Sequence, residues 1–238
     1  GDAMGPYAFN WRFFMCKRTK LADRTLPDYS KGEEIFNMVS HIVGGALGIV
    51  ALVLCIITAA EAGSAIDVVS SCIYGSTLIL LYTMSSVYHG LHPSMGKKVM
   101  QVLDHCTIYF LIAGSYTPIL LVAMRSKYPT LAWTLFGIVW GCAIVACTLT
   151  AIDLRKYRVF SMICYLAMGW VIIFFIKQTY EVMRLGGIIL LITGGIAYTI
   201  GSVLYGLGKK KKWMHSIFHL FIIAGSVLHF FAIIFYAL

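Results

Sequence analysis

Charged residues are scarce in this sequence, and their scarcity excludes a water-soluble fold. Only 12% of the 238 residues are charged, whereas ordinary soluble domains have roughly 25%. Apolar residues make up 60% of the chain, and they occur in long blocks rather than in the alternating patterns of amphipathic helices or strands. A surface built from such blocks must face lipid. The sequence therefore predicts an all-α integral membrane protein.

Two other familiar features are missing. The seven cysteines include no CxxC pair and lie mostly inside apolar blocks, which is typical of small packing residues. No short apolar stretch with a cleavage site precedes the first long block, so we expect no removed signal peptide. The opening Gly1-Asp2-Ala3-Met4 is typical of an expression remnant, with Met15 as an alternative natural start, and we leave residues 1–14 out of functional consideration.

The long apolar blocks are numerous enough for a polytopic bundle. A helix needs about 20 residues, at 1.5 Å each, to cross roughly 30 Å of hydrocarbon. Residues 1–34 then form an amino-terminal segment and residues 35–238 a transmembrane domain with short loops, so any chemistry must come from the helices or their ends. Seven spans are predicted, at Ile35–Ala60, Asp67–His89, Asp104–Met124, Leu131–Ile152, Val159–Ile176, Leu185–Leu207 and Trp213–Leu238.

The distribution of Lys and Arg predicts the orientation of these spans. Fifteen of the 19 Lys and Arg residues flank one side of the predicted bundle and four flank the other. The positive-inside rule then places the amino terminus in the cytoplasm and the carboxyl terminus outside the cell, in the plasma membrane. The net charge of +9 and the run Lys209–Lys212 could also indicate a nucleic-acid or anionic-lipid patch. We favour topology as their origin and expect no nucleic-acid partner.

Most histidines fall at one membrane side in this topology. His89 ends span 2, Asp104 and His105 open span 3, and His215 with His219 opens span 7, all near the cytoplasmic face. His41 lies slightly deeper, roughly 9 Å into span 1. The topology that gives these depths was set by the loop charges alone. The common depth of the histidines is therefore an independent observation.

The spacing and depth of three histidines favour a metal site. His215 and His219 are four residues apart, which places both imidazoles on one helix face where they can converge on one ion, and His89 joins them from another helix. Three neutral imidazoles and an open fourth position are the ligand set of catalytic zinc. Asp104 could then accept a proton from water, and Ser85 could orient a ligand or donate to an oxyanion.

Simpler interpretations stay open for these residues. The same groups could be interfacial side chains or interhelical hydrogen bonds, and haem between helices is a further alternative. His92 beside Pro93 is typical of a solvated loop, and we expect His105 to face away from Asp104. His41 could contact and orient one of the metal-binding residues, or it could be a packing residue. His229 lies roughly 21 Å beyond His215 and cannot join the cluster.

Several motifs in this order resemble the hemolysin III family, which belongs with the progestin and adipoQ receptors. They are Ser85-Ser-Val-Tyr-His89, Asp104-His105, Ala113-Gly-Ser-Tyr-Thr-Pro118, His215-Ser-Ile-Phe-His219 and Leu228-His229-Phe230. The resemblance runs from about Glu33 to Leu238. It implies seven helices, an internal amino terminus, and zinc held by His89, His215 and His219, with Asp104 contacting the zinc-bound water and Ser85 nearby.

The resemblance leaves the function open between several classes. The wider superfamily includes alkaline ceramidases, so we expect a zinc-dependent hydrolase of a lipid amide or ester bond, with membrane lipids as partners and a role in lipid homeostasis. A receptor or sensor with structural zinc and a cytolytic pore are the alternatives. The long carboxyl tail and extended amino-terminal region of the animal hormone receptors are missing, so we do not expect hormone recognition.

Overall fold

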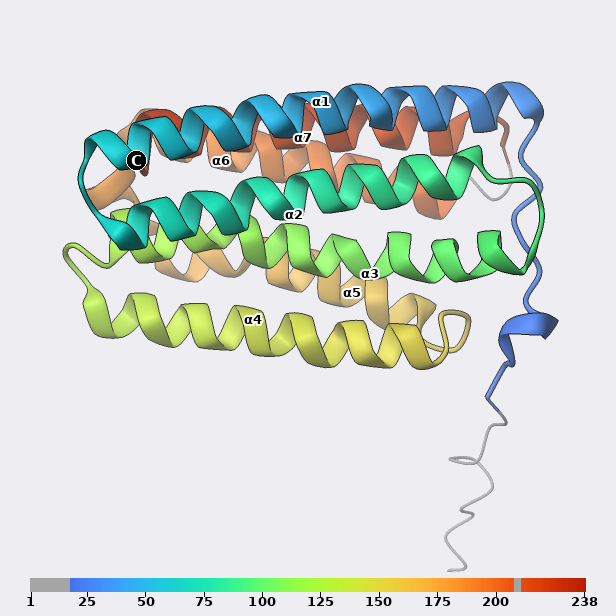
Figure 1. Ribbon diagram of the computed structural model, residues 1–238. Helices are drawn as coiled ribbons and strands as arrows, with labels where there is room; N and C mark the ends of the chain where they lie inside the picture. Colours follow the sequence, from blue (N-terminus) through green and yellow to red (C-terminus); the bar gives the residue numbers. More distant parts are fainter. Residues whose placement is uncertain (1–17, 208–210) are drawn as a thin grey trace, which may run out of the picture.

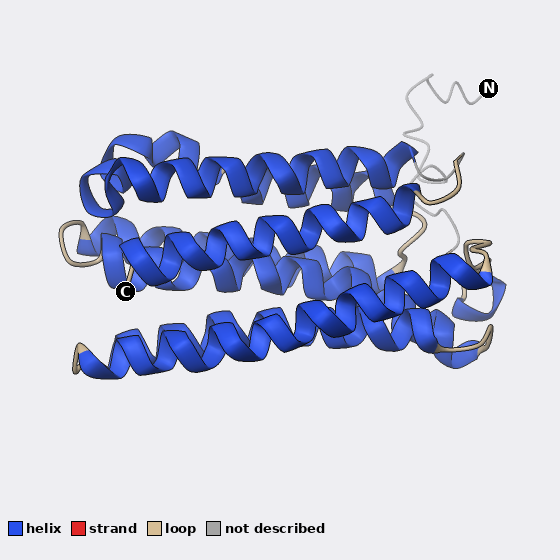
Figure 2. Ribbon diagram, turned by 90° about the horizontal axis from the view of Figure 1, so that it is seen from above, coloured by secondary structure: helices blue, strands red, loops and turns tan. Residues whose placement is uncertain are grey.

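A computed structural model describes residues 18–207 and 211–238, and these ranges contain helices and no strand. Figures 1 and 2 show the long helices lying side by side in one bundle. The helices are η2 (Leu21–Asp23), α1 (Lys31–Glu61), α2 (Ala65–Gly90), α3 (Met95–Pro118), the π-helical η3 (Ile119–Met124), α4 (Pro129–Ile152), α5 (Arg158–Gly169), the 3₁₀-helical η4 (Val171–Phe175), α6 (Ile176–Leu207) and α7 (Met214–Tyr236).

The outer surface of the bundle is apolar. In α1, for example, Ile42, Val43 and Ile49 are each more than half exposed. In water such a surface would be unusually large for a single chain. It suits the hydrocarbon of a bilayer, as the composition predicts.

The prediction of seven separate helical spans is wrong in one respect. Within the described ranges, six helical segments are long and apolar enough to cross a membrane, and the predicted spans 5 and 6 belong to one of them, Arg158–Gly206. We placed a loop at Lys177–Arg184 because charges interrupt the apolar run there. Charge alone does not break a helix, and residues 176–183 contain neither Pro nor Gly. Within α6, Ile176–Leu207, only Arg184 has a non-helical backbone, with φ 58° and ψ 179°.

The start of the third predicted span is also wrong. α3 begins at Met95 rather than Asp104, after Ser94, whose hydroxyl accepts from the backbone N–H of Lys97. The hydropathy pattern predicts a later start because Lys97 and Lys98, in the first turn of α3, are charged. Asp104 therefore lies roughly 14 Å along the helix, so the structure moves it from a helix end to a position inside the bundle.

The start of α1 is tied to the start of α7. Ser30 caps α1 through its bond with the backbone N–H of Glu33, and the Glu33 carboxylate accepts from the backbone N–H of Ser30. The same carboxylate also accepts from the backbone N–H of Trp213, at 2.7 Å. This capping box fixes both helix starts beside one another.

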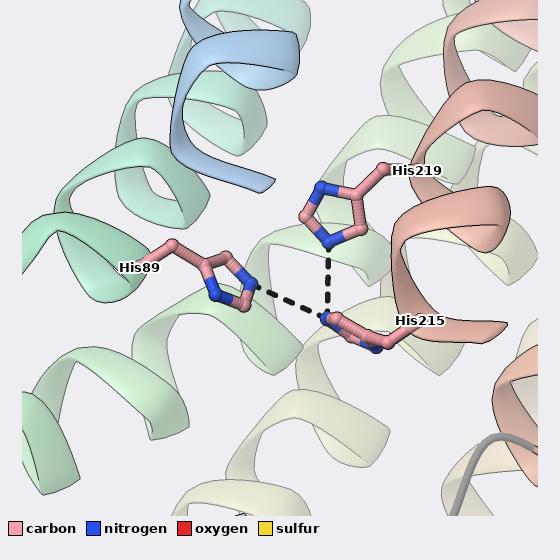
Figure 3. Close-up of side chains that lie close together, drawn as sticks. All are labelled: His89, His215 and His219. Atoms are coloured by element: carbon pink, nitrogen blue, oxygen red, sulfur yellow. Dashed lines mark hydrogen bonds between the residues drawn. The ribbon is translucent and has the colours of Figure 1, made fainter. Parts of the chain in front are cut away.

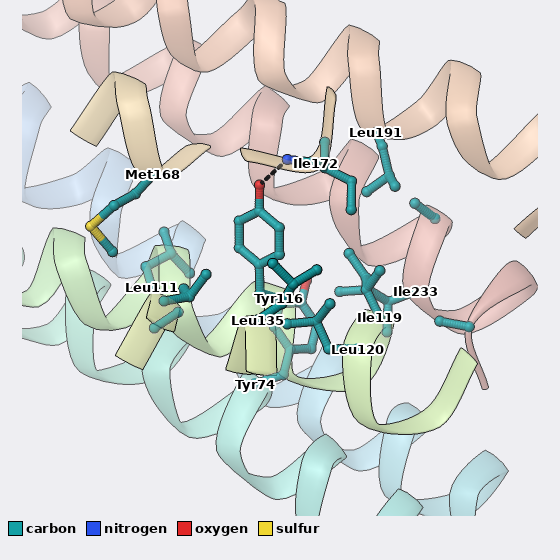
Figure 4. Packing of buried hydrophobic residues seen from close by; sticks show 14 of the residues in the cluster. Tyr74, Leu111, Tyr116, Ile119, Leu120, Leu135, Met168, Ile172, Leu191 and Ile233 are labelled. Carbon is teal, nitrogen blue, oxygen red and sulfur yellow. Dashed lines mark hydrogen bonds between the residues drawn. The ribbon is translucent and has the colours of Figure 1, made fainter. Parts of the chain in front are cut away.

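Buried side chains join α3 to the irregular segment around η4. The Tyr116 hydroxyl donates to Gly169 O (2.9 Å) and accepts from the N–H of Ile172 (3.1 Å), the bond drawn in Figure 4. These bonds satisfy backbone groups where α5 gives way to a 3₁₀ turn. Leu111, Ile119 and Leu191 pack in the same cluster.

Some sequence predictions concern residues outside the described ranges. These predictions concern residues 1–14, Cys16, and two lysines of the run Lys209–Lys212. The other six cysteines are free thiols.

Candidate metal centre

Three histidines from two helices point at one another inside the bundle (Figure 3). His89 comes from the last turn of α2, and His215 and His219 come from the first two turns of α7. Nε2 of His215 is 3.3 Å from Nε2 of His89 and 3.0 Å from Nε2 of His219. All three side chains are buried, at 2%, 7% and 1% exposure. The structure thus brings together the three residues that the spacing and depth singled out.

The geometry of these nitrogens fits a small cation. One ligand atom from each of the three histidines lies within 4.8 Å of the others. Nitrogens that each bind one Zn²⁺ at about 2.0–2.1 Å in tetrahedral geometry lie roughly 3.3–3.4 Å apart. The two distances from Nε2 of His215, 3.3 and 3.0 Å, are close to that value, so the three histidines could hold a metal ion.

Only one of the three rings has a charged partner on its outer nitrogen. Nδ1 of His89 lies 2.6 Å from Oε2 of Glu34, and Oε1 of Glu34 lies 2.6 Å from Nζ of Lys97. Nδ1 of His215 and Nδ1 of His219 make no hydrogen bond within the described ranges. The centre is therefore supported from outside mainly through His89.

Two further rings cover the centre. Tyr29, just before α1, stacks on His215 with ring centroids 4.9 Å apart, and burial raises the pKa of its phenol so that it stays neutral. On the other side, the His41 ring stacks on His219 at 3.7 Å. His41 is 3% exposed, and neither of its ring nitrogens has a partner in the described part of the chain. His41 is thus a neighbour of the site and lies outside the group of three converging nitrogens.

A mainly apolar cavity begins at the histidines and extends between the helices. Asp104 and Ser85 line it together with His215 and His219. The Asp104 side chain is 15% exposed, and Ser85 is 1% exposed. Asp104 does not belong to the group of close ligand atoms. The rest of the wall comes chiefly from α3, α5, α6 and α7, with Ile108, Ile112, Leu166, Leu191 and Ile222 among its apolar residues.

The remaining histidines lie at different distances from the centre. We expected His105 to face away from Asp104, but its Nδ1 lies 3.7 Å from the Asp104 carboxylate, because the ring folds back to donate to Gln101 O and accept from the Tyr205 hydroxyl. His229 lines the same cavity, three turns of α7 beyond the centre, and its Nε2 donates to Leu191 O. His92 is exposed, as expected for a loop residue.

Sequence reasoning missed Glu34, Lys97 and Tyr29. Lys97 entered only the count of flanking Lys and Arg, and Glu34 entered no count, although each lies beside a span that carries or borders the histidines. Tyr29 precedes any span and has no spacing relation to the others. A carboxylate at the predicted depth of His89 was the one available signal, and it could have identified Glu34.

The chain is similar to known proteins over most of its length. A family model described as haemolysin-III related matches residues 29–230. The chain is 41% identical over 206 residues to Hemolysin-3 of Bacillus cereus, across 87% of this chain and 92% of that protein. It is 39% identical over 204 residues to the Hemolysin-3 homolog of Bacillus subtilis strain 168, across 86% and 94%. The human monocyte to macrophage differentiation factor is 28% identical over 175 residues, 69% of each chain.

Proposed function

This chain belongs to the haemolysin-III related family, and we propose that it is a zinc-dependent hydrolase that cleaves an amide or ester bond of a membrane lipid. Its apolar helices and its family make it a multi-pass protein of the plasma membrane. The observation that carries the proposal is the convergence of three buried imidazoles, two of which line a mainly apolar cavity together with Asp104 and Ser85. Such a cavity suits a lipid chain, and the head of a lipid bound there would lie beside His215 and His219.

Each residue of the proposed site has a distinct role. His89, His215 and His219 would hold zinc, which when bound makes water a competent nucleophile near neutral pH. Asp104 lines the same cavity as His215 and His219 and would accept a proton and return it to the leaving group. The Ser85 hydroxyl would donate a hydrogen bond to the oxygen that becomes negative in the transition state.

The orientation supports access to lipid from the cytoplasmic leaflet. We propose that Arg158–Gly206 crosses the membrane twice, reversing at Arg184, so that six helical segments make seven crossings. Its 49 residues are more than twice the roughly 20 needed for one crossing. The start of α1 and the carboxyl terminus lie at opposite ends of the bundle in Figure 1, which suits an odd number. The histidine centre then lies at the amino-terminal, cytoplasmic side.

Hydrolysis by reconstituted protein tests the proposal. Zinc-loaded protein in lipid nanodiscs should release fatty acid from at least one class among ceramides and phospholipids. Asp104→Asn should lower kcat by about 10²–10⁴-fold because it removes the proton acceptor while keeping the shape of the side chain. If zinc-loaded protein cleaves none of these lipids, the hydrolase is excluded.

A receptor or sensor with structural zinc is the second candidate. The three histidines join α2 to α7, so a bound ion would also tie these helices together. In that case zinc removal should lower the unfolding temperature strongly while no lipid product forms. The open cavity beside the centre favours the hydrolase, because structural zinc sites are closed by four protein ligands.

A further inference from the structure

We propose that Glu34 is a positioning residue that fixes the ring tautomer of His89 and so prepares its Nε2 to bind the metal. The inference rests on the proposed metal centre and adds to it a residue that donates no ligand atom. Its basis is the short contact between the Glu34 carboxylate and the outer nitrogen of His89.

The contact with Glu34 determines which nitrogen of His89 carries the proton. A neutral imidazole carries one proton, on either Nδ1 or Nε2. At 2.6 Å from a carboxylate oxygen, Nδ1 must carry it, because a lone pair there would face another lone pair. The free lone pair of His89 is therefore on Nε2, and that atom faces His215. Carboxylate partners of this kind orient metal-binding histidines and raise their basicity.

Lys97 holds the Glu34 carboxylate in place. Its other oxygen accepts from Nζ of Lys97, which also donates to Leu91 O at 2.9 Å. Lys97 is 3% exposed, and its ammonium lies 5.3 Å from the centre of the Tyr88 ring. The carboxylate is thus fixed between a cation from α3 and an imidazole from α2. This arrangement keeps it ionised and limits its rotation.

The neighbouring carboxylate, Glu33, has different partners. Glu33 lies in the same first turn of α1, yet it bonds Ser30 and the backbone of Trp213 and does not contact the three histidines. The two residues therefore divide two tasks, since Glu33 fixes the start of α1 and Glu34 contacts the centre. Glu33 provides a matched control for any effect of removing a carboxylate from this turn.

Zinc affinity is the first test. In the full chain in detergent, measured by competition with a zinc chelator, Glu34→Ala should bind zinc about 10–100-fold more weakly than wild type. Glu34→Gln should recover part of that loss because its amide oxygen can still accept the Nδ1 proton. Glu33→Ala should bind zinc like wild type, even if it unfolds at a lower temperature. Equal affinity in wild type and Glu34→Ala would overturn the inference while leaving the metal centre intact.

The tautomer can also be read without metal. In zinc-free protein labelled with ¹⁵N-histidine, and with the His89 signal assigned by its loss in His89→Gln, the wild type should show a protonated Nδ1 and an unprotonated Nε2. Glu34→Ala should shift this signal toward the other tautomer, and Glu33→Ala should not. A wild-type ring protonated at Nε2 would overturn the inference by itself. Absence of zinc from wild type would instead overturn the proposed function, with the tautomer result unaffected.

Discussion

Buried imidazoles that face one another need something to occupy their nitrogens. Within the described ranges, the Nε2 atoms of His89, His215 and His219 meet only each other, whereas the large majority of buried side-chain polar atoms in proteins have a hydrogen-bond partner. The neutral rings could pair two at a time, but one nitrogen would then stay unsatisfied. A single cation satisfies all three at once.

Asp153 is a residue outside the spans whose charge should stabilise the fold. Although burial opposes ionisation, backbone N–H groups of Thr19, Lys156 and Arg155 hold the pKa of the Asp153 carboxyl below its usual value. At pH 7 Asp153→Asn should lower the free energy of unfolding by about 1.5–3 kcal/mol, the range for hydrogen bonds to a charged group.

The pH dependence of that difference has a defined sign. A carboxyl whose pKa is depressed in the native state stabilises it above the unfolded-state pKa of about 3.9, and this stabilisation is lost as pH falls through the native pKa. Thermal unfolding of both proteins from pH 7 to pH 3 should therefore show a constant gap that narrows only below about pH 4. A gap that widens in acid would contradict this assignment.

At the same residue scale, the sequence allowed part of the site to be predicted. His215 and His219 were identifiable because helical periodicity alone places them on one face, and His89 because loop charges fixed its depth. Glu34 was not, because its contact with His89 depends on how close α1 lies to α2. No spacing within one helix encodes that distance.

The helices α1 and α2 approach closely because glycines leave room at their contact. A Cβ added at Gly75 would lie 2.6 Å from Cβ of Leu52 and 2.7 Å from its backbone Cα. Gly75→Ala should therefore push the helices apart and lower the free energy of unfolding by about 1–3 kcal/mol. Thermal unfolding in one detergent measures the effect.

α4 offers a control for that substitution. A Cβ at Gly137 would have nothing within 4 Å, so Gly137→Ala should be neutral or stabilise the helix by up to about 1 kcal/mol through propensity. Similar losses in both variants would show that α1 and α2 are not close at Gly75.

Helix boundaries were harder to predict than helix existence. Hydropathy located the apolar stretch of every long helix. It does not indicate that the polar first turns of α3 are helical, or that Lys177–Met183 is part of a helix. Both errors have one cause, since helical hydrogen bonding depends on backbone groups and capping, whereas hydropathy reports only the side chains.

For the whole molecule, the number of crossings determines which ends share a side. In a background without native cysteines, Ala62→Cys and an epitope added after Leu238 should be accessible to impermeant reagents on intact cells. His92→Cys should react only after permeabilisation, because it lies at the opposite, positively flanked side. An epitope on the same side as His92 would require an even number of crossings and would contradict the reversal at Arg184.

The metal content of purified protein tests the central claim most directly. Wild type should hold one zinc ion per chain, His219→Ala should lose it, and Asp104→Ala should retain it, since Asp104 lines the adjoining cavity and is not one of the three converging ligands. His229→Ala, on the same helix but remote from the centre, should keep its zinc and control for loss of a buried histidine. Elemental analysis of the four proteins gives the answer. Undiminished zinc in His219→Ala would contradict the site.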